Sequence, residues 1–326
     1  MRRAEFLRRL AGLAGGVLAG GRSAVATHNA ARAAEQPGSA APLPTRPLGR
    51  TGVDVTVLGL GGHHLARTGS ARGVRELLGV ALDEGIRFLD TAESYQDGDS
   101  ERWLGAALGD RRRDVFLMTK TFDFPARTAE GSRRHLEGSL SRLRTDRLDL
   151  WQLHSVRSVA DVDRAFGPGG SMEAILRAKE DGVARFIGVT GHHEPAANLR
   201  ALHYWDQGLR FDTMQMPLNP IDHHQRSFER LVLPELVRRG IGVIAMKTSA
   251  DGALLRERLC TAAECHRYVW AMPVSVAVIG MERAELVREN ARTARGAPMP
   301  DAERATLRSR IAPQASIALE WYKQTG

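Results

Sequence analysis

The segment GIRFLDTAESYQDGDSERWLG, residues 85–105, places a carboxylate and a phenol five positions apart, at Asp90 and Tyr95. The hydrophobic run before Asp90 is typical of a buried strand, and the polar residues after it are typical of a loop that leads into a helix. Tyrosine is scarce in this chain, with four in 326 residues. A phenol on a loop just beyond a strand is therefore a candidate for chemistry.

Lysine is equally scarce, because four lysines stand against 42 arginines, and two of the four, Lys120 and Lys247, end hydrophobic runs. A compact ammonium can act on a neighbouring titrating group in ways that a guanidinium cannot. If Asp90, Lys120 and His154 converge around Tyr95, the ammonium favours the phenolate and lowers the tyrosine pKa from about 10 toward neutrality. The carboxylate would hold Lys120 charged, and His154 would orient or hydrogen-bond a substrate oxygen.

A phenol in that setting is suited to general acid catalysis, because it can protonate an alkoxide as the alkoxide forms. An alkoxide forms when hydride reaches a carbonyl carbon, and hydride delivery is the work of a nicotinamide cofactor. Each residue alone has a structural explanation, such as a helix cap for Asp90 or a core position for His154. Four such residues at or just beyond predicted strand ends favour an active site.

The rest of the pattern predicts the elements that would position these residues. Short apolar or β-branched runs predict strands over Val55–Gly62, Arg87–Thr91, Val115–Thr121, Leu148–His154, Phe186–Val189, Thr213–Pro217, Gly242–Lys247 and Val274–Gly280. Helical periodicity between them predicts helices that include Ala71–Glu84, Ala129–Leu143, Met172–Asp181, His224–Arg239 and Arg283–Ala294. About eight strand and helix alternations favour a closed (β/α)8 barrel, or TIM barrel, over an open doubly wound sheet. A short N-terminal β-hairpin turning at residues 50–52 is expected to plug the barrel floor.

In such a barrel the loops that follow the strands converge on one mouth. The polar residues at the predicted strand ends and in their loops are His63, His64, Asp90, Tyr95, Lys120, His154, Thr190, His192, His193, Gln215, Asn219 and Lys247. We therefore expect these side chains to share one end of the barrel.

On these residues the chain resembles the aldo-keto reductase superfamily, from residue 48 to about residue 290. The matching motifs are LGRTGVDVTVLGLGG, FLDTAESYQDGDSERWLGAAL, VFLMTK, DLWQLH, MQMPLN, GVIAMK and GMERAELVREN. The resemblance implies a (β/α)8 barrel that binds NADPH or NADH without a Rossmann fold and acts on a small carbonyl substrate. It also implies a catalytic tetrad in which the tyrosine is the acid: Asp90, Tyr95, Lys120 and His154.

The resemblance implies cofactor contacts at the nicotinamide end. Gln215 matches the glutamine that holds the carboxamide. The family's Ser-Asn after strand five reads Thr190-Gly191 here, so we expect Thr190 and His192 to supply this contact. The aromatic residue that commonly stacks on the nicotinamide has no clear counterpart around Met246.

At the phosphate and adenine end, the implied contacts are Lys247, Gly280, Met281, Arg283, Glu289 and Asn290. The position where relatives often carry Arg or Gln on the adenosine phosphate is Leu286, and Arg283 or Arg288 could substitute for it. NADPH is expected over NADH as the default of the family.

Two other functions stay open. The histidine pairs at 63–64 and 192–193, together with His154 and Asp90, could ligate a metal ion as in barrel hydrolases. Those enzymes usually carry His-x-His on strand one and an acid on strand eight, whereas this chain has adjacent histidines and a Gly-Met end. The other alternative is a non-catalytic NAD(P)-binding, redox-sensing subunit. The complete tetrad favours a catalytic enzyme over this binding subunit.

The first 26 residues, MRRAEFLRRLAGLAGGVLAGGRSAVA, combine paired arginines with a short apolar stretch and small residues at possible cleavage sites. This layout is typical of an export signal and resembles a twin-arginine signal. We predict a signal over residues 1–34, a linker over 35–47 and the barrel over 48–326. The apolar stretch is too short for a stable membrane span. The expected location is the periplasm, with the twin-arginine translocase as a partner during export, or the cytoplasm if the signal does not function.

Charge and cysteine content bound the remaining possibilities. The net charge is +8, and residues 1–26 contribute five arginines and one glutamate to it, which leaves +4 for the other residues. No basic run is interleaved with aromatic residues, so we expect no nucleic-acid partner. Cys260 and Cys265 are predicted to lie on different faces of one helix, as buried thiols and not as a disulfide.

Overall fold

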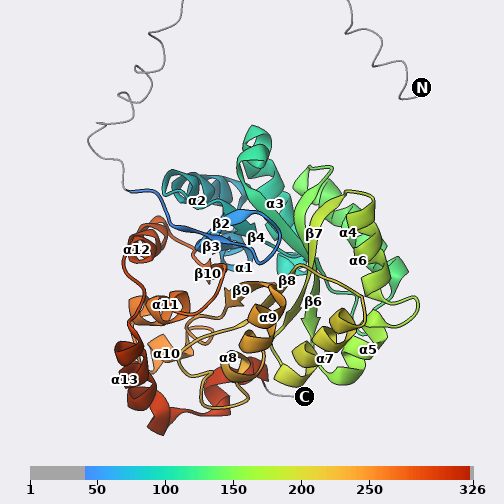
Figure 1. Cartoon of the computed structure of the whole chain (residues 1–326). Coiled ribbons are helices and arrows are strands. Elements are labelled where there is room, and N and C mark those ends of the chain that lie inside the picture. Colours follow the sequence, from blue (N-terminus) through green and yellow to red (C-terminus); the bar gives the residue numbers. More distant parts are fainter. Residues whose placement is uncertain (1–40, 324–326) are drawn as a thin grey trace, which may run out of the picture. The chain divides into compact units, whose positions relative to one another are not determined.

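The computed structural model describes residues 41–323 (Figure 1). The predicted export signal over residues 1–34 and the first part of the predicted linker lie outside the described residues. Within residues 41–323, no helix has both the length and the apolar character needed to cross a membrane.

The described residues form a closed barrel of eight parallel strands in the order β10-β3-β4-β5-β6-β7-β8-β9 (Figure 1). These strands are β3 (Leu58–Gly61), β4 (Phe88–Asp90), β5 (Phe116–Thr121), β6 (Leu148–Val156), β7 (Ala184–Gly191), β8 (Thr213–Pro217), β9 (Gly242–Met246) and β10 (Val276–Gly280). The barrel closes where β10 pairs with both β3 and β9. The predicted (β/α)8 barrel is confirmed.

Helices surround the strands and carry the chain back between them (Figure 1). They are α1 (Gly62–Leu65), α2 (Ala71–Asp83), α3 (Asp99–Leu108), α4 (Ala129–Leu143), α5 (Val159–Phe166), α6 (Ser171–Glu180), α7 (Pro195–Asp206), α8 (Phe228–Leu231), α9 (Leu233–Arg239), α10 (Ala253–Arg256), α11 (Ala262–Trp270), α12 (Ala284–Arg295) and α13 (Asp301–Ile311). Tighter 3-10 turns are η2 (Ala66–Thr68), η3 (Tyr95–Gly98), η4 (Gly109–Asp114), η5 (Ala312–Gln314) and η6 (Ile317–Lys323).

Local sequence sets where several helices begin. Ser70, Thr128 and Ser158 precede α2, α4 and α5, and each side chain accepts a hydrogen bond from a backbone N–H of the first turn. The single helix predicted over His224–Arg239 is divided into α8 and α9. Pro234 accounts for the division, because it has no N–H to donate to the carbonyl of Arg230 four residues earlier.

A two-stranded hairpin precedes the barrel. It pairs β1 (Thr45–Pro47) with β2 (Asp54–Thr56) in antiparallel register. The strand predicted over Val55–Gly62 is therefore two strands, because its first residues belong to the hairpin and the others to β3. The folded part also begins earlier than predicted, because the last three residues of the predicted linker form β1.

The hairpin closes the barrel at the end where the strands begin. Leu48 and Val55 are buried there and pack with Phe88 and Phe116, the first residues of β4 and β5. The two phenylalanine rings stack with their centroids 5.0 Å apart. Gly49 allows the close approach, because a side chain at this position would collide with the backbone of β9. Because the hairpin covers this end, a ligand site in the described barrel is expected at the opposite end, where the strands stop.

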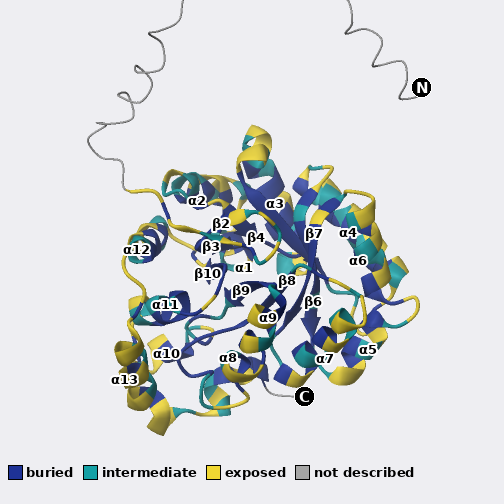
Figure 2. Cartoon of the chain, viewed as in Figure 1, coloured by how far each residue is buried: buried dark blue, intermediate teal, exposed yellow. Residues whose placement is uncertain are grey.

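A second apolar layer lies between the barrel and its helices. Figure 2 shows the strands buried and the exposed residues on the outer faces of the helices. Outward strand residues such as Leu89, Trp151 and Ile187 are at most 1% exposed and pack in this layer. Because the layer surrounds the barrel, it holds the strand ends in fixed positions relative to one another.

Candidate active site

Three of the predicted tetrad residues are in direct contact at the open end of the barrel. Asp90 ends β4, Lys120 lies near the end of β5, and Tyr95 begins η3 in the loop after β4. The Nζ atom of Lys120 donates to Asp90 Oδ1 at 2.8 Å, to the carbonyl of Thr91 at 2.9 Å and to Tyr95 Oη at 3.2 Å. The ammonium is 1% exposed, so all three of its N–H groups are directed at protein oxygen atoms. Lys120 thus joins the carboxylate to the phenol.

The electrostatics of this chain differ from the prediction in one respect. Burial raises the pKa of Tyr95 above its ordinary value, and the charge and hydrogen bond of Lys120 offset this effect only in part. Burial by itself would lower the pKa of Lys120, but Asp90 and Tyr95 raise it overall. The predicted lowering of the tyrosine pKa toward neutrality is therefore wrong for this structure, because the loss of solvent outweighs the effect of the ammonium. The phenol is held in its protonated form at neutral pH.

The fourth predicted residue, His154, lies beside the phenol. Its ring is 5.7 Å from that of Tyr95 and 5.6 Å from that of Phe122, with an edge-on arrangement in both cases. Burial lowers the pKa of His154 well below its ordinary value, and the charge of Lys120 adds to the effect. The imidazole is therefore neutral at neutral pH, and its Nδ1 atom is buried with no hydrogen-bond partner among the described residues.

A buried ion pair fixes the backbone around His154. Arg127 donates to both carboxylate oxygens of Asp161 at 2.8 Å, and it also donates to the carbonyls of His154 at 2.9 Å and Ser155 at 2.8 Å. Ser155 has a φ of 56° at an irregularity of β6, and its N–H donates to Thr190 Oγ1 at 2.6 Å. Neither Arg127 nor Asp161 was predicted as part of the site. Nothing in their local sequence distinguishes them from the many exposed Arg and Asp residues.

Three residues predicted at the nicotinamide end lie at the same end of the barrel. Gln215, on β8, donates from Nε2 to Asp90 Oδ2 at 3.0 Å, so it belongs to the same cluster as the tetrad. Its Oε1 atom is buried and has no partner among residues 41–323. The hydroxyl of Thr190 accepts the hydrogen bond from the N–H of Ser155 that is described above. His192 follows β7, and its ring stacks on that of His193 with the centroids 4.4 Å apart.

Lys247 follows β9 in a left-handed backbone conformation, with a φ of 53°. Its Nζ lies 4.9 Å from the ring centroid of Tyr322 and 5.5 Å from that of Trp321, both in η6. Tyr322 also lies 6.2 Å from the ring of His192, and Trp321 Nε1 donates to Asp251 Oδ2 at 2.9 Å. Aromatic side chains from the end of the described chain thus stand next to β7 and β9. The sequence offered no local signal for this arrangement, because η6 is distant from both strands along the chain.

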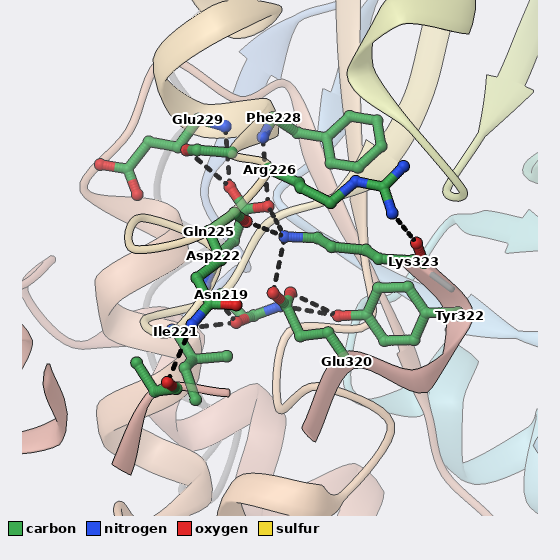
Figure 3. Close-up of polar contacts among 12 residues, drawn as sticks. Asn219, Ile221, Asp222, Gln225, Arg226, Phe228, Glu229, Glu320, Tyr322 and Lys323 are labelled. Carbon is green, nitrogen blue, oxygen red and sulfur yellow. Dashed lines mark hydrogen bonds and ion pairs between the residues drawn. The ribbon is translucent and has the colours of Figure 1, made fainter. Parts of the chain in front are cut away.

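A buried polar cluster holds η6 in place (Figure 3). Lys323 Nζ lies 2.6 Å from Asp222 Oδ1 and 2.6 Å from Glu320 Oε2. Tyr322 Oη donates to Glu320 Oε1 at 2.8 Å, and Asn219 Nδ2 donates to the same carboxylate oxygen at 3.1 Å. All of these residues are at most 1% exposed. The loop after β8 therefore holds η6 through the ion pair of Asp222 with Lys323 and through the hydrogen bonds of Asn219 to Glu320 and Tyr322.

The residues predicted at the phosphate and adenine end other than Lys247, which is described above, make no hydrogen bond or ion pair with the tetrad among the described residues. A side chain at Gly280 would collide with the imidazole of His64, so the glycine lets that ring lie against the end of β10. Met281 is fully buried in the outer apolar layer, so its backbone and not its side chain is the part that could contact a phosphate. Arg283 and Glu289 are exposed, whereas Asn290 is 8% exposed on α12. No hydrogen bond or ion pair among residues 41–323 links these three to the tetrad.

Within each histidine pair the two rings lie against each other. The rings of His63 and His64 are 5.3 Å apart, and His63 also lies 5.3 Å from Tyr95. In the described part of the chain, no group of three or more His, Cys, Asp or Glu side chains is placed to hold a metal ion. The metal-hydrolase alternative therefore finds no ligand set there.

Comparison with known proteins points to one family. The model of the family described as "Aldo/keto reductase family" matches residues 57–264. The uncharacterized oxidoreductase YrpG of Bacillus subtilis (strain 168) is 30% identical over 229 residues, which cover 64% of this chain and 67% of the relative. The 6-dehydroglucose reductase of Novosphingobium aromaticivorans is 26% identical over 279 residues, which cover 77% of this chain and 90% of the relative. The holo form of an aldo-keto reductase from Bacillus halodurans superposes with a TM-score of 0.69 at 24% identity, covering 86% of this chain and all of that one.

Proposed function

Because this chain belongs to the aldo/keto reductase family and is an NAD(P)H-dependent oxidoreductase, we propose that it transfers hydride between a nicotinamide and a small carbonyl or alcohol, with Tyr95 as the general acid and base. The observation that carries the proposal is the position of Lys120 between Asp90 and Tyr95. A buried ammonium that contacts a phenol on one side and a carboxylate on the other is suited to stabilise a phenolate that forms transiently.

The bound nicotinamide supplies the hydride in carbonyl reduction. Tyr95, protonated at neutral pH because burial raises its pKa, donates its proton to the carbonyl oxygen as negative charge develops there. Lys120 stabilises the phenolate that remains, and Asp90 keeps the ammonium charged and directed. In alcohol oxidation the same phenolate takes the proton back.

His154 orients the substrate oxygen. A neutral imidazole carries one N–H donor, and the ring lies edge-on to Tyr95. A donor at this position and the phenol can approach one oxygen atom from two sides. The buried Arg127–Asp161 pair holds the backbone carbonyl of His154, which fixes the position of the ring.

The described residues fit a nicotinamide cofactor at one point in particular. Gln215 Oε1 is a buried acceptor without a partner among the described residues, and a primary carboxamide carries the N–H donor that this atom lacks. Thr190, near the end of β7, and His192, just after β7, would flank the same group. At the other end we assign the cofactor phosphates to Lys247, Arg283 and the backbone of residues 280–281, and adenine to Glu289 and Asn290. The positive side chains among these support NADPH over NADH.

The substrate is assigned only to a class. Phe122 and Phe124 stack at 5.5 Å next to His154 and provide an apolar wall, and the relative named 6-dehydroglucose reductase supports including sugar-derived carbonyl compounds in a first panel. A panel of aromatic aldehydes, short aliphatic aldehydes and oxidised sugars would show whether the enzyme prefers apolar carbonyl substrates or sugar-derived ones.

One experiment tests the proposal and its alternative together. The purified full chain is titrated with NADPH and NADH by fluorescence and then mixed with the substrate panel while oxidation of the cofactor is followed by absorbance. Binding followed by oxidation supports the proposal. Binding without oxidation by any member would favour the redox-sensing subunit, and no binding of either cofactor would contradict both.

Export is a separate part of the proposal and rests on the sequence. Residues 1–34 direct the folded protein through the twin-arginine translocase to the periplasm, with Arg2 and Arg3 as the recognised pair. Replacing both arginines by lysine should leave the protein in the cytoplasm of a bacterium with an intact pathway. Continued export of that variant, or export in a strain without the translocase, would contradict this part.

A further inference from the structure

Helix α11 begins with a capping box whose geometry brings two cysteines together. Thr261 is the N-cap, and its Oγ1 accepts a hydrogen bond from the N–H of Glu264 at 3.2 Å. The carboxylate of Glu264 in turn accepts from the N–H of Thr261 at 2.7 Å. In this arrangement the residue before the cap faces the fourth residue of the helix, and two apolar side chains usually pack there.

In this chain both of those positions are cysteines. The Sγ atoms of Cys260 and Cys265 are 2.9 Å apart, and the two residues are 8% and 0% exposed. The prediction that they lie on different faces of one helix is wrong, because Cys260 precedes the helix and the chain turns at Thr261. Five residues of separation then bring the side chains together instead of apart.

We propose that Cys260 and Cys265 are a redox-modification site, a dithiol that a disulfide-bearing oxidant of the glutathione class converts to an intramolecular disulfide. A disulfide holds its sulfurs at about 2 Å, so the two atoms need to approach by less than 1 Å from their present separation. The hydrogen bonds of the capping box fix the turn between them. The folded chain therefore already holds the two thiols close to the separation that a disulfide requires.

The surroundings assign different roles to the two thiols. Cys260 lines an open cavity of about 520 Å³ together with Arg258, Glu264 and Arg310, whereas Cys265 is fully buried. Arg310 donates to the carbonyl of Leu259 at 3.3 Å and to Glu264 Oε1 at 2.8 Å, which places its guanidinium near Cys260. The hydrogen bond from Cys265 lowers the pKa of the Cys260 thiol, and the same contact and burial raise the pKa of Cys265. Cys260 is the attacking thiol and Cys265 the resolving one.

The reaction balances as two thiol–disulfide exchanges. The Cys260 thiolate attacks one sulfur of the oxidant, which breaks the oxidant's S–S bond and releases one thiol. Cys265 then loses its proton and attacks the Cys260 sulfur of the mixed disulfide, which releases the second thiol. The protein gives up two protons and two electrons, and one oxidant disulfide becomes two thiols.

The bond would act on the segment that carries Lys247 and Asp251. That segment runs from the end of β9 through α10 to Cys260, and Asp251 accepts a hydrogen bond from Trp321. An oxidised pair would covalently tie the end of the segment to α11. The modification therefore lies outside the tetrad but on the same loop as residues at the barrel mouth.

The test uses the reduced full chain. The protein is incubated with oxidised glutathione, quenched with acid, alkylated under denaturing conditions without reductant and digested with trypsin. No Lys or Arg lies between the cysteines, so both fall in the peptide of residues 259–267. The expected product is this peptide lighter by two hydrogens and without alkyl groups. Two alkylated cysteines after an exposure that fully oxidises free dithiothreitol would overturn the proposal, as would disulfide-linked dimers as the only product.

Variants separate the roles of the two thiols. Cys265→Ser should accumulate a stable mixed disulfide with glutathione at Cys260, and Cys260→Ser should leave Cys265 free for alkylation after denaturation. The capping box is tested with Thr261→Ala, which should oxidise several-fold more slowly than wild type, and with Thr261→Ser as its control, which should oxidise at the wild-type rate. Equal rates for all three proteins would contradict preorganisation by the helix start.

Discussion

The ammonium nitrogen of Lys120 lies 3.2 Å from the phenol oxygen of Tyr95 and 4.8 Å from the centroid of its ring. Lys120 lies in β5 and Tyr95 in the loop after the neighbouring strand β4, so the pairing of these two strands brings the two segments side by side. Because burial raises the pKa of Tyr95 in spite of this contact, the ammonium serves the phenolate formed during turnover more than it acidifies the resting phenol.

Replacing Tyr95 by phenylalanine tests that assignment. The variant keeps the ring and loses the proton, so kcat for carbonyl reduction should fall about 10²- to 10⁴-fold, as expected for the loss of a general acid. The Kd for NADPH from fluorescence titration should change less than about threefold, because no proposed cofactor contact is removed. A kcat within tenfold of wild type would contradict the role of the phenol.

The pH profile of reduction follows from the directions of two pKa shifts. The pKa of Tyr95 is raised above about 10 and that of His154 is lowered well below about 6.5. Neither group should therefore change its charge between pH 7 and 8.5, and kcat/KM should be flat in this range. At lower pH the activity should fall as His154 gains a proton beside Lys120. A sigmoidal change centred near pH 7.5 would contradict both directions, and His154→Gln should remove the acid limb if His154 is its source.

The barrel, and the meeting of Asp90, Tyr95, Lys120 and His154 at one end of it, could be predicted because each strand has a recognisable local pattern. Apolar runs that end in Asp90, Lys120 and His154 are short-range patterns, and parallel strands in a barrel must end on the same side. The pKa of Tyr95 could not be predicted in the same way, because it depends on how much solvent the packed mouth excludes. The charged residues near a phenol can be inferred from the sequence, but the extent to which the folded protein buries the phenol cannot.

Other features were missed for two different reasons. The contact between η6 and the loop after β8 joins Lys323 to Asp222, which are 101 residues apart, and no local pattern marks such a pair. The cysteine pair was readable, because Thr261 and Glu264 have the spacing of a capping box. Extending the predicted helix back over Cys260 concealed that signal.

Gln215 offers a test of the cofactor site that does not depend on turnover. In Gln215→Met the side chain keeps its approximate length but loses the acceptor Oε1 and the N–H that holds Asp90. The Kd for NADPH should rise about tenfold, since a lost hydrogen bond in a buried site costs about 1.4 kcal/mol. Isothermal titration of the two proteins measures the difference. An unchanged Kd would remove Gln215 from the cofactor site.

Substituting Arg127 tests whether its hydrogen bonds hold the backbone of His154 in position. Arg127→Lys removes the two-pronged contact with Asp161 and the donors to the carbonyls of His154 and Ser155. Disrupting a buried ion pair should lower the free energy of unfolding by about 3 kcal/mol, measured by urea denaturation, and kcat should fall more than the affinity for cofactor. The matched control is Arg133→Lys on the exposed face of the following helix α4, where the pairs with Glu130 and Glu137 are solvated. That variant should change the free energy of unfolding by less than about 0.5 kcal/mol. Equal effects of the two substitutions would contradict a special role for Arg127.

The cluster around Lys323 makes stability depend on pH in an unusual direction. Asp222 and Glu320 share one ammonium in a buried setting, and burial raises the pKa of Asp222 to about 6, although Lys323 opposes the change. An aspartate in the unfolded chain titrates near 3.9, so between these values the folded state holds a proton that the unfolded state has released. The stabilisation from Asp222 is therefore complete below about pH 4 and lost as the pH rises through about pH 6.

Asp222→Asn removes this titration while keeping the shape of the side chain. The free energy of unfolding of wild type minus that of the variant should decrease by an amount on the order of 3 kcal/mol between pH 4 and pH 7, as measured by urea denaturation at a series of pH values. Asp181→Asn is the control, because its partner Arg177 is exposed, and its difference should vary by less than about 0.5 kcal/mol over the same range. A difference for Asp222→Asn that increases with pH would mean that the ionised carboxylate stabilises the folded chain, which would place the folded pKa of Asp222 below that of the unfolded chain and contradict the proposed effect of burial.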